Sequence, residues 1–157
     1  MPIKKEFIAQ KMITDKQNRF AIKIDPTLSW TVATKGELVE YHAIDQSKQT
    51  DYVIAIDRKY FGPPSQADAR EFFEGYIDGL KASKLTIVDW NLEKSSLPDA
   101  NAYRAKIIAL FPTGTRLIIE KHVTTREYLY SITFSYPEGT KAEQYNEYLQ
   151  SFRFLPK

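Results

Sequence analysis

In the segment 126–136, REYLYSITFSY, large aromatic and aliphatic side chains alternate with mainly small polar ones. A period of two is typical of a β-strand, because successive side chains of a strand point to opposite faces of the sheet. Aromatic and β-branched residues also favour a pleated surface. We therefore expect an interior strand with one face in the core and a partner strand along each edge. The residues expected on the core face are Tyr128, Tyr130, Ile132, Phe134 and Tyr136.

The rest of the chain contains candidate partner strands, which are short apolar or alternating runs that end at turn residues. Residues 112–114, Pro-Thr-Gly, have the form of a three-residue hairpin loop, with glycine where a positive φ is needed. This loop would set Ile107 opposite Ile119 and would also set Lys106 opposite Glu120, a favourable pair of opposite charges. The expected strands are 5–13, 19–24, 30–32, 37–44, 52–60, 85–92, 103–111 and 115–123.

An amphipathic helix is expected to begin at Ser65, directly after two prolines. Ser65 followed by Asp68 is a capping-box pattern, in which the serine hydroxyl accepts a hydrogen bond from a backbone N–H. Gly75 and Gly79 are expected to let the flank of this helix approach a strand closely. The apolar residues recur at the spacing of one helical face. They are Ala69, Phe72, Phe73, Tyr76, Ile77 and Leu80.

A second amphipathic helix is expected near the C-terminus, where Thr140 and Glu143 form a full capping box. The chain order is thus strands, a helix, strands and a helix, with short turns between the strands. This order predicts an α+β fold, a mainly antiparallel twisted sheet of about six to eight strands with one helix on each face. We expect residues 1–157 to form a single domain whose core buries roughly 70 % of the unfolded surface.

Composition excludes several classes of function. The formal net charge of +2 is too small to predict a nucleic-acid partner or binding to a membrane surface. The absence of cysteine rules out disulfides, thiolate nucleophiles and cysteine-ligated zinc. The longest apolar run, near 107–111, is far shorter than the ~20 residues that span a bilayer, so no transmembrane segment is expected. The sequence has no phosphate-binding loop, nucleotide fingerprint or metal-ligand spacing, and no cofactor is predicted.

Three features of the chain are informative in combination. An early strand at 20–26 leads through a proline turn to Trp30, an aromatic strand at 128–136 follows late, and a short last helix runs into 151–155. With these features the chain resembles the PsbP-like family, which includes DcrB-type periplasmic proteins. The resemblance implies a PsbP-like α/β/α sandwich and a bacterial binding or assembly protein that engages a protein partner. It implies no catalytic residue, and therefore a protein that is not an enzyme.

The resemblance also implies a compartment. Members of the family are often exported and lipid-anchored, so we expect an extracytoplasmic protein, either periplasmic or lipid-anchored. Residues 1–7, MPIKKEF, contain no apolar signal core, so a signal and its lipobox cysteine would lie upstream of Met1. A native start at Met1 would instead favour a cytoplasmic relative. Related domains resemble chaperones for secreted effectors, which is an alternative function. The oligomeric state is left open.

His42 and His122 are the two imidazole side chains that could act as general bases. A four-residue loop at 124–127 would place Ser131 and Thr133 on the same sheet face as His122. A catalytic triad needs a nucleophile within hydrogen-bond reach of a positioned base. We favour a solvated polar sheet face over such a site.

The same sheet face has a second interpretation, as a mixed-charge surface for a protein partner. Cross-strand ion pairs worth about 0.5 kcal/mol each would explain the same residues without a partner. The runner-up function is a small-molecule carrier, with a pocket between the helices and the aromatic sheet face, lined by Tyr128, Tyr130 or Phe72. The residues predicted for the partner surface are Arg104, Lys106, Arg116, Glu120, His122, Ser131 and Thr133.

Overall fold

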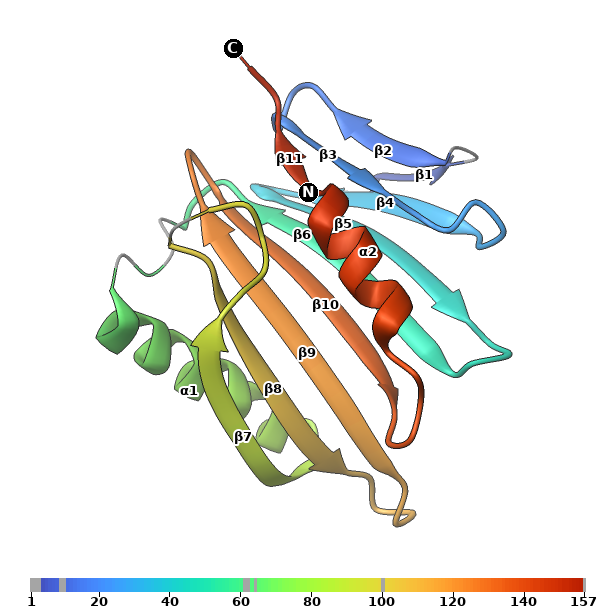
Figure 1. The fold of residues 1–157 in the computed structure, drawn as a ribbon, viewed down its shortest axis with the longest axis vertical. Coiled ribbons are helices and arrows are strands. Elements are labelled where there is room, and N and C mark those ends of the chain that lie inside the picture. Colours follow the sequence, from blue (N-terminus) through green and yellow to red (C-terminus); the bar gives the residue numbers. More distant parts are fainter. Residues whose placement is uncertain (1–3, 9–10, 61–62, 64, 100, 157) are drawn as a thin grey trace.

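The computed structural model describes residues 4–8, 11–60, 63, 65–99 and 101–156, with side chains from residue 11 onward. These residues form an eight-stranded antiparallel sheet, a three-stranded sheet and two helices (Figure 1). In the large sheet β1 and β7 are the edge strands. In spatial order its strands are β1 (Lys4–Ile8), β4 (Trp30–Lys35), β5 (Leu38–Asp45), β6 (Thr50–Asp57), β10 (Leu129–Pro137), β9 (Arg116–Thr125), β8 (Tyr103–Leu110) and β7 (Thr86–Lys94).

The three-stranded sheet packs over one face of the large sheet. It contains β2 (Met12–Asp15), β3 (Phe20–Lys23) and β11 (Arg153–Phe154), with β3 in the middle. The hairpin of β2 and β3 agrees with the prediction, but the expected single first strand and single sheet are wrong, since β1 and β2 belong to different sheets. The reason lies in β3, which packs on the large sheet through Phe20, whose ring centre is 5.8 Å from that of Tyr41 and 6.0 Å from that of Tyr130. Since β2 pairs with β3, it belongs to this second layer, whereas β1 pairs with β4 in the large sheet.

β10 lies in the interior of the large sheet, between β6 and β9, as its alternating pattern predicts. Tyr130, Ile132 and Phe134 on its aromatic face are at most 3 % exposed. Helix α2 (Glu143–Ser151) packs on this face, where Tyr145 stacks on Phe134 with the ring centres 4.9 Å apart. The small sheet contributes to the same core. The aromatic face of β10 is therefore filled by the protein itself.

The start of α2 differs from the prediction. Its N-cap residue is Ala142, and no side chain makes a capping hydrogen bond there. Thr140 belongs instead to the turn after β10, where its N–H donates to the carbonyl oxygen of Pro137 at 3.2 Å. The predicted capping box of Thr140 and Glu143 is therefore wrong, because the turn continues two residues further than the pattern indicated.

Helix α1 (Gln66–Ala82) covers the opposite face of the large sheet. It begins as predicted, because the hydroxyl oxygen of Ser65 accepts a hydrogen bond of 3.2 Å from the N–H of Asp68. The buried side chain of Phe73 belongs to the same core cluster as Ile107 of β8. In Figure 1, α1 lies along the β7 and β8 side of the sheet. The prediction of an antiparallel sheet with one helix on each face is confirmed.

Part of the α1 side of the sheet is left open. Val53 and Ala55 of β6 point to this side and are half-buried, whereas their neighbours Ile54 and Ile56 on the α2 side are 3 % and 0 % exposed. Within the described residues, the backbone of α1 lies closest to β7 and β8. The β5 and β6 region of this face is therefore accessible beside the helix.

The register of β8 and β9 agrees with the prediction. Ile107 lies opposite Ile119, and Lys106 lies opposite Glu120. Along β9, the odd-numbered residues from 117 to 125 consequently face α1, and the even-numbered ones face the α2 side. This alternation determines which charged side chains of β9 reach each face.

The outer strand β7 is irregular. Its pairing with β8 shifts between Ile87 and Asp89, so that Val88 has no partner in the ladder. The side chain of Val88 is 48 % exposed. A shift of this kind is a β-bulge, which increases the local twist of the strand.

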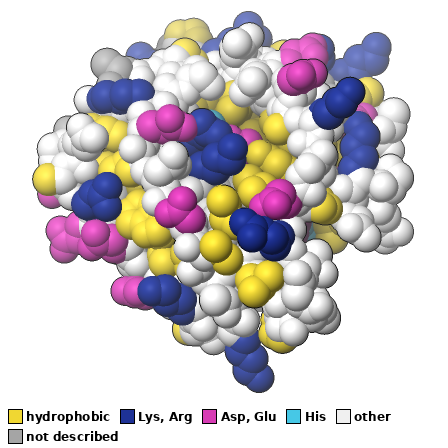
Figure 2. Space-filling model, turned by 60° about the horizontal axis from the view of Figure 1, so that its bottom comes forward, with side chains coloured by type: hydrophobic (Ala, Val, Ile, Leu, Met, Phe, Trp, Pro, Cys, Tyr) yellow, Lys and Arg dark blue, Asp and Glu magenta, His cyan; other side chains and the backbone are white. Residues whose placement is uncertain are grey.

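The surface carries charges of both signs. In Figure 2, Lys and Arg side chains are interspersed with Asp and Glu side chains and with hydrophobic groups, so this view contains no continuous patch of one charge. Neither helix in the described part of the chain combines the length and apolar character needed to cross a bilayer.

Candidate functional site: a groove beside α1

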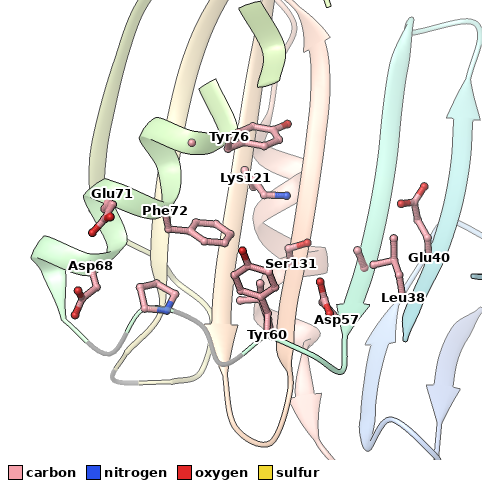
Figure 3. A pocket seen from close by; sticks show the side chains of 14 residues that line it. Leu38, Glu40, Asp57, Tyr60, Asp68, Glu71, Phe72, Tyr76, Lys121 and Ser131 are labelled. Atoms are coloured by element: carbon pink, nitrogen blue, oxygen red, sulfur yellow. The ribbon is translucent and has the colours of Figure 1, made fainter. Parts of the chain in front are cut away.

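A groove of about 890 Å³ lies between α1 and the open part of the sheet. One wall is the flank of α1, the floor is formed by β9 and β10, and the opposite wall by β5 and β6 (Figure 3). Ala55 and Ser131 are small and take up little of the space, and Gly75 has no side chain. A Cβ atom added at Gly75 would meet nothing within 4 Å, so the groove reaches the helix backbone itself.

Aromatic and aliphatic side chains line much of the groove. Phe72 and Tyr76 project from α1 over the floor, where Leu129 is buried (Figure 3). Leu38 and Tyr60 also line the groove, and these side chains are 36 % and 58 % exposed. Apolar surface that faces water inside a concave site is favourable to bury against an apolar ligand.

The charges in the groove are unevenly distributed. Four of its residues are acidic, namely Glu40, Asp57, Asp68 and Glu71, and one is basic, namely Lys121. Asp68 accepts a hydrogen bond of 2.6 Å from the hydroxyl of Ser65, and Asp57 accepts one of 2.9 Å from the backbone of Lys59. The acidic groups lie on both walls, whereas the single ammonium group rises from the floor (Figure 3).

Lys121 has an unusual environment for a lysine. Its Nζ atom lies 4.6 Å from the centre of the Tyr76 ring, which is a cation–π distance. The described residues place no carboxylate within ion-pair distance of it. Burial lowers the pKa of Lys121 to about 8, and the more distant Glu40 carboxylate opposes this shift in part. Burial also raises the pKa of Tyr76 to about 12, so its phenol stays neutral.

No protein-family model matches the chain, and no curated protein matches it either. The arrangement of the described residues must therefore support any functional proposal. Among those residues, no group of three or more His, Asp and Glu side chains is placed to hold a metal ion.

The predicted partner surface is divided between the two faces of the sheet. Ser131 lies opposite Val123 and Thr133 lies opposite Lys121, so both share the α1 side with the groove. The expectation that they share a face with His122 is wrong. The loop at 124–127 would have set Glu120 opposite Ser131, but β9 and β10 pair at Thr125 and Leu129, which sets Glu120 opposite Phe134. An odd shift in register moves each side chain to the other face.

The other predicted residues remain on the α2 side. Arg104 of β8 bridges Glu93 of β7 and Glu120 of β9. The hydroxyl of Tyr136 donates a hydrogen bond of 2.6 Å to the same Glu120, which is 8 % exposed. The structure therefore brings Arg104 and Glu120 together in a network that joins four strands.

The remaining two predicted cations are at the surface. Lys106 is exposed on β8, and the Nε atom of Arg116 lies 2.8 Å from a carboxylate oxygen of Glu138. Both side chains of this last pair are close to half exposed, so the ion pair contributes little to stability.

His122 is buried rather than placed at a cleft. Its side chain is 2 % exposed, and its Nδ1 atom lies 2.6 Å from the hydroxyl of Ser95. Burial, together with the nearby Arg104 guanidinium, lowers the pKa of His122 to about 3, so the ring is neutral. This hydrogen bond joins the loop after β7 to β9. Ser131 and Thr133 lie across the sheet, and neither can be a nucleophile for this imidazole.

His42 is more accessible. Its Nε2 atom lies 2.6 Å from Asp51, and the two side chains are 39 % and 46 % exposed. A surface pair of this kind differs from the buried histidine–carboxylate pair of a triad.

The sequence patterns predict neither this groove nor a functional role for Lys121. The carrier hypothesis named the aromatic sheet face, but Tyr130 lies on the filled side and only Phe72 of the three named residues lines the groove. The close approach expected at Gly75 and Gly79 is also wrong, since a Cβ at either position would meet nothing within 4 Å. A usable signal was present in β6, where Ala55 and Asp57 alternate with large apolar residues. Such small and polar residues are typical of a face that no helix covers.

Proposed function

We propose that this protein is a non-enzymatic binding protein that holds a small amphipathic molecule in the groove beside α1. The observation that supports this function is the groove of about 890 Å³ with aromatic walls and a few charged groups. Sites for small ligands commonly measure roughly 300–1,000 Å³ and are mainly apolar with a few polar groups. The groove belongs to this class in both size and chemistry.

The apolar lining favours a ligand with a hydrocarbon portion. Leu38 and Tyr60 leave apolar surface in contact with water at the edge of the groove, and Phe72 presents an aromatic ring inside it. Each CH₂ group that moves from water into such a site contributes about 0.8 kcal/mol. A polar end of the ligand would lie beside the charged groups of the groove, where water is accessible.

A relation to the PsbP-like family is part of the proposal. It is supported by the strand, proline turn and Trp30 near the start of the chain. The indole N–H of Trp30 donates to the carbonyl oxygen of Asp25 at 3.1 Å, and this bond closes the turn. Trp30 is 3 % exposed, so the motif is structural. The same relation favours an extracytoplasmic bacterial protein.

Displacement of a neutral fluorescent dye tests the binding function. Nile red is expected to bind the groove, and decanol is expected to displace it. Octanol has two fewer CH₂ groups and is expected to bind about tenfold more weakly. Failure of both dye and alcohols to bind at micromolar concentrations would contradict the proposal.

A pair of glycine variants locates the site. Gly75→Leu places a branched side chain in the groove, whereas Gly79→Leu lies one turn further along α1, outside the groove lining. Both positions have free space for a Cβ, so both variants are expected to fold. Dye binding should be lost in Gly75→Leu and retained in Gly79→Leu. Equal binding by the two variants would place the dye elsewhere.

A protein partner is a second candidate, favoured by the surface around the Arg104 network. Arg104 is held by two glutamates, and Lys106 is exposed next to it on the same strand. Phe111, directly after β8, is 37 % exposed. A double variant Lys106→Ala and Arg116→Ala removes two surface cations without disturbing the buried network. Unchanged recovery of co-purifying proteins by this variant would remove this candidate.

A further inference from the structure

We propose that Lys121 forms an imine with the carbonyl group of an aldehyde whose apolar tail lies in the groove. This inference rests on the proposed binding function and adds the chemical class of the ligand. The amine comes from the middle of β9, a rigid strand with partners on both edges, so its position is fixed by the sheet.

The geometry makes the amine available to a ligand. Lys121 lines the groove from the floor, and in Figure 3 its Nζ atom points into the open space below the Tyr76 ring. The described residues provide no ion-pair partner that would hold the amine away from the groove. Phe72 and Leu129 line the same groove, and an aldehyde tail packed on them would keep its carbonyl carbon beside the amine.

The charges of the groove favour a neutral carbonyl compound over an anion. Four carboxylates line the walls against one ammonium group on the floor, so a carboxylate or phosphate ligand would be repelled overall. An aldehyde carries no charge and experiences no such repulsion. Once formed, a protonated imine is a cation, and the Tyr76 ring and the Glu40 carboxylate would both stabilise it.

The reaction balances without an oxidant or a reductant. The neutral amine attacks the carbonyl carbon, one of its two protons passes to the oxygen, and a carbinolamine results. The carbon–oxygen bond then breaks, the hydroxyl leaves with the second nitrogen proton as water, and a carbon–nitrogen double bond remains. A proton from solvent converts the imine to its cationic form.

The acidity of Lys121 is consistent with this role. Its pKa of about 8 leaves a substantial fraction of free amine near neutral pH. An exposed lysine with an ordinary pKa has about a hundredfold less free amine at the same pH. Lys106, exposed on the other side of the sheet, provides a matched comparison within the same molecule.

Reductive trapping tests the proposal on the full chain. Decanal is added with cyanoborohydride, which reduces an imine to a stable amine, and the modified lysine is identified by peptide mass spectrometry. The expected result is about tenfold more modification at Lys121 than at Lys106, with a rate that rises with pH to a midpoint near 8. Equal modification of both lysines would overturn the proposal.

Two variants and two non-aldehyde probes separate this inference from the binding function. Lys121→Met and Lys121→Arg should both lose the adduct, and urea unfolding curves of both variants show that each still folds. Decanol binding without preferential trapping at Lys121 would overturn the imine and leave the binding function intact. Tighter binding of decanoate than of decanol would also overturn it, because Lys121 would then act as an anion site. If neither decanol nor decanal binds, both proposals fail.

Discussion

The hydroxyl of Tyr130 donates a hydrogen bond of 2.6 Å to the carbonyl oxygen of Asn18, and this bond joins the centre of the large sheet to the turn of the β2–β3 hairpin. Asn18 is 2 % exposed, and its side chain contacts Asp15 at 2.7 Å and Arg58 at 2.8 Å. Burial raises the pKa of Tyr130 to about 12, so its hydroxyl keeps its proton. The small sheet is thus attached by polar groups as well as by apolar packing.

Removing this hydroxyl is expected to weaken the attachment. In Tyr130→Phe the buried carbonyl of Asn18 loses its donor, and the free energy of unfolding should fall by about 1–2 kcal/mol. Urea denaturation measures the change. Tyr128→Phe is the matched control, because the described residues include no hydrogen-bond partner for the Tyr128 hydroxyl. Equal losses in the two variants would contradict the role of this bond.

The N-termini of the two helices are capped differently, so similar substitutions there should change stability by different amounts. Ser65→Ala removes the side-chain cap of α1 and should lower the free energy of unfolding by about 1 kcal/mol. Thr140→Ala should change it by less than about 0.5 kcal/mol, because Thr140 does not cap α2. Thermal and urea unfolding of both variants provide the comparison. A larger loss in Thr140→Ala would show that the threonine has a capping role after all.

His122 should make stability depend on pH. Its ordinary pKa of 6.5 applies to the unfolded chain, whereas the folded value is about 3. As the pH falls below 6.5, the unfolded chain takes up a proton that the folded protein does not, so stability is lost down to about pH 3. The slope from this group is about 1.4 kcal/mol per pH unit.

His122→Asn tests this dependence. Asparagine retains an oxygen acceptor near the position of Nδ1, so the contact with Ser95 can persist. Unfolding curves between neutral pH and about pH 4.5 should be less pH-dependent in the variant than in the wild type, by up to the slope of one group. Identical pH dependence would mean that the imidazole is protonated in the folded state as well.

Lys121 should make the free energy of unfolding depend on pH in the alkaline range. The unfolded chain keeps its lysine proton up to about 10.5, whereas the folded protein releases it from about 8, so stability should rise across this interval. Lys121→Met should lack this rise and should be more stable than the wild type at neutral pH, because a partly desolvated ammonium group is no longer required. Lys106→Met controls for the loss of one positive charge. A destabilised Lys121→Met would indicate that the cation–π contact with Tyr76 outweighs desolvation.

The fold was predictable where local signals determine the geometry. The register of β8 and β9 follows from the tight turn at 112–114, in which Gly114 adopts a φ of +90°. The connection between β9 and β10 has no glycine or proline. Its turn is closed by a bond of 3.3 Å from the Arg126 N–H to the Tyr128 carbonyl oxygen, which no residue type signals. The predicted loop was therefore displaced, and Ser131 was assigned to the wrong face.

The position of the groove depends on which strands α1 covers, and the amphipathic pattern of the helix does not specify this. The stripe that includes Phe73 shows that α1 must cover apolar surface, but it does not specify which strands lie beneath it. The helix covers the β7 and β8 side, and the β5 and β6 side of the same face remains open. Lys121 shows why the site could not be predicted. From the sequence alone, a lysine in an apolar strand can equally be a groove residue or an exposed residue of an edge strand.

The bulge at Val88 affects whether β7 can pair with a strand of another molecule. An outer strand offers unpaired backbone groups to which a strand of another molecule can add. β7 is nine residues long, which is ample for such an addition. Because Val88 stands outside the ladder, a foreign strand cannot remain in step along the whole of β7. The β-bulge at Val88 thus protects this edge of the sheet from edge-to-edge aggregation into fibres.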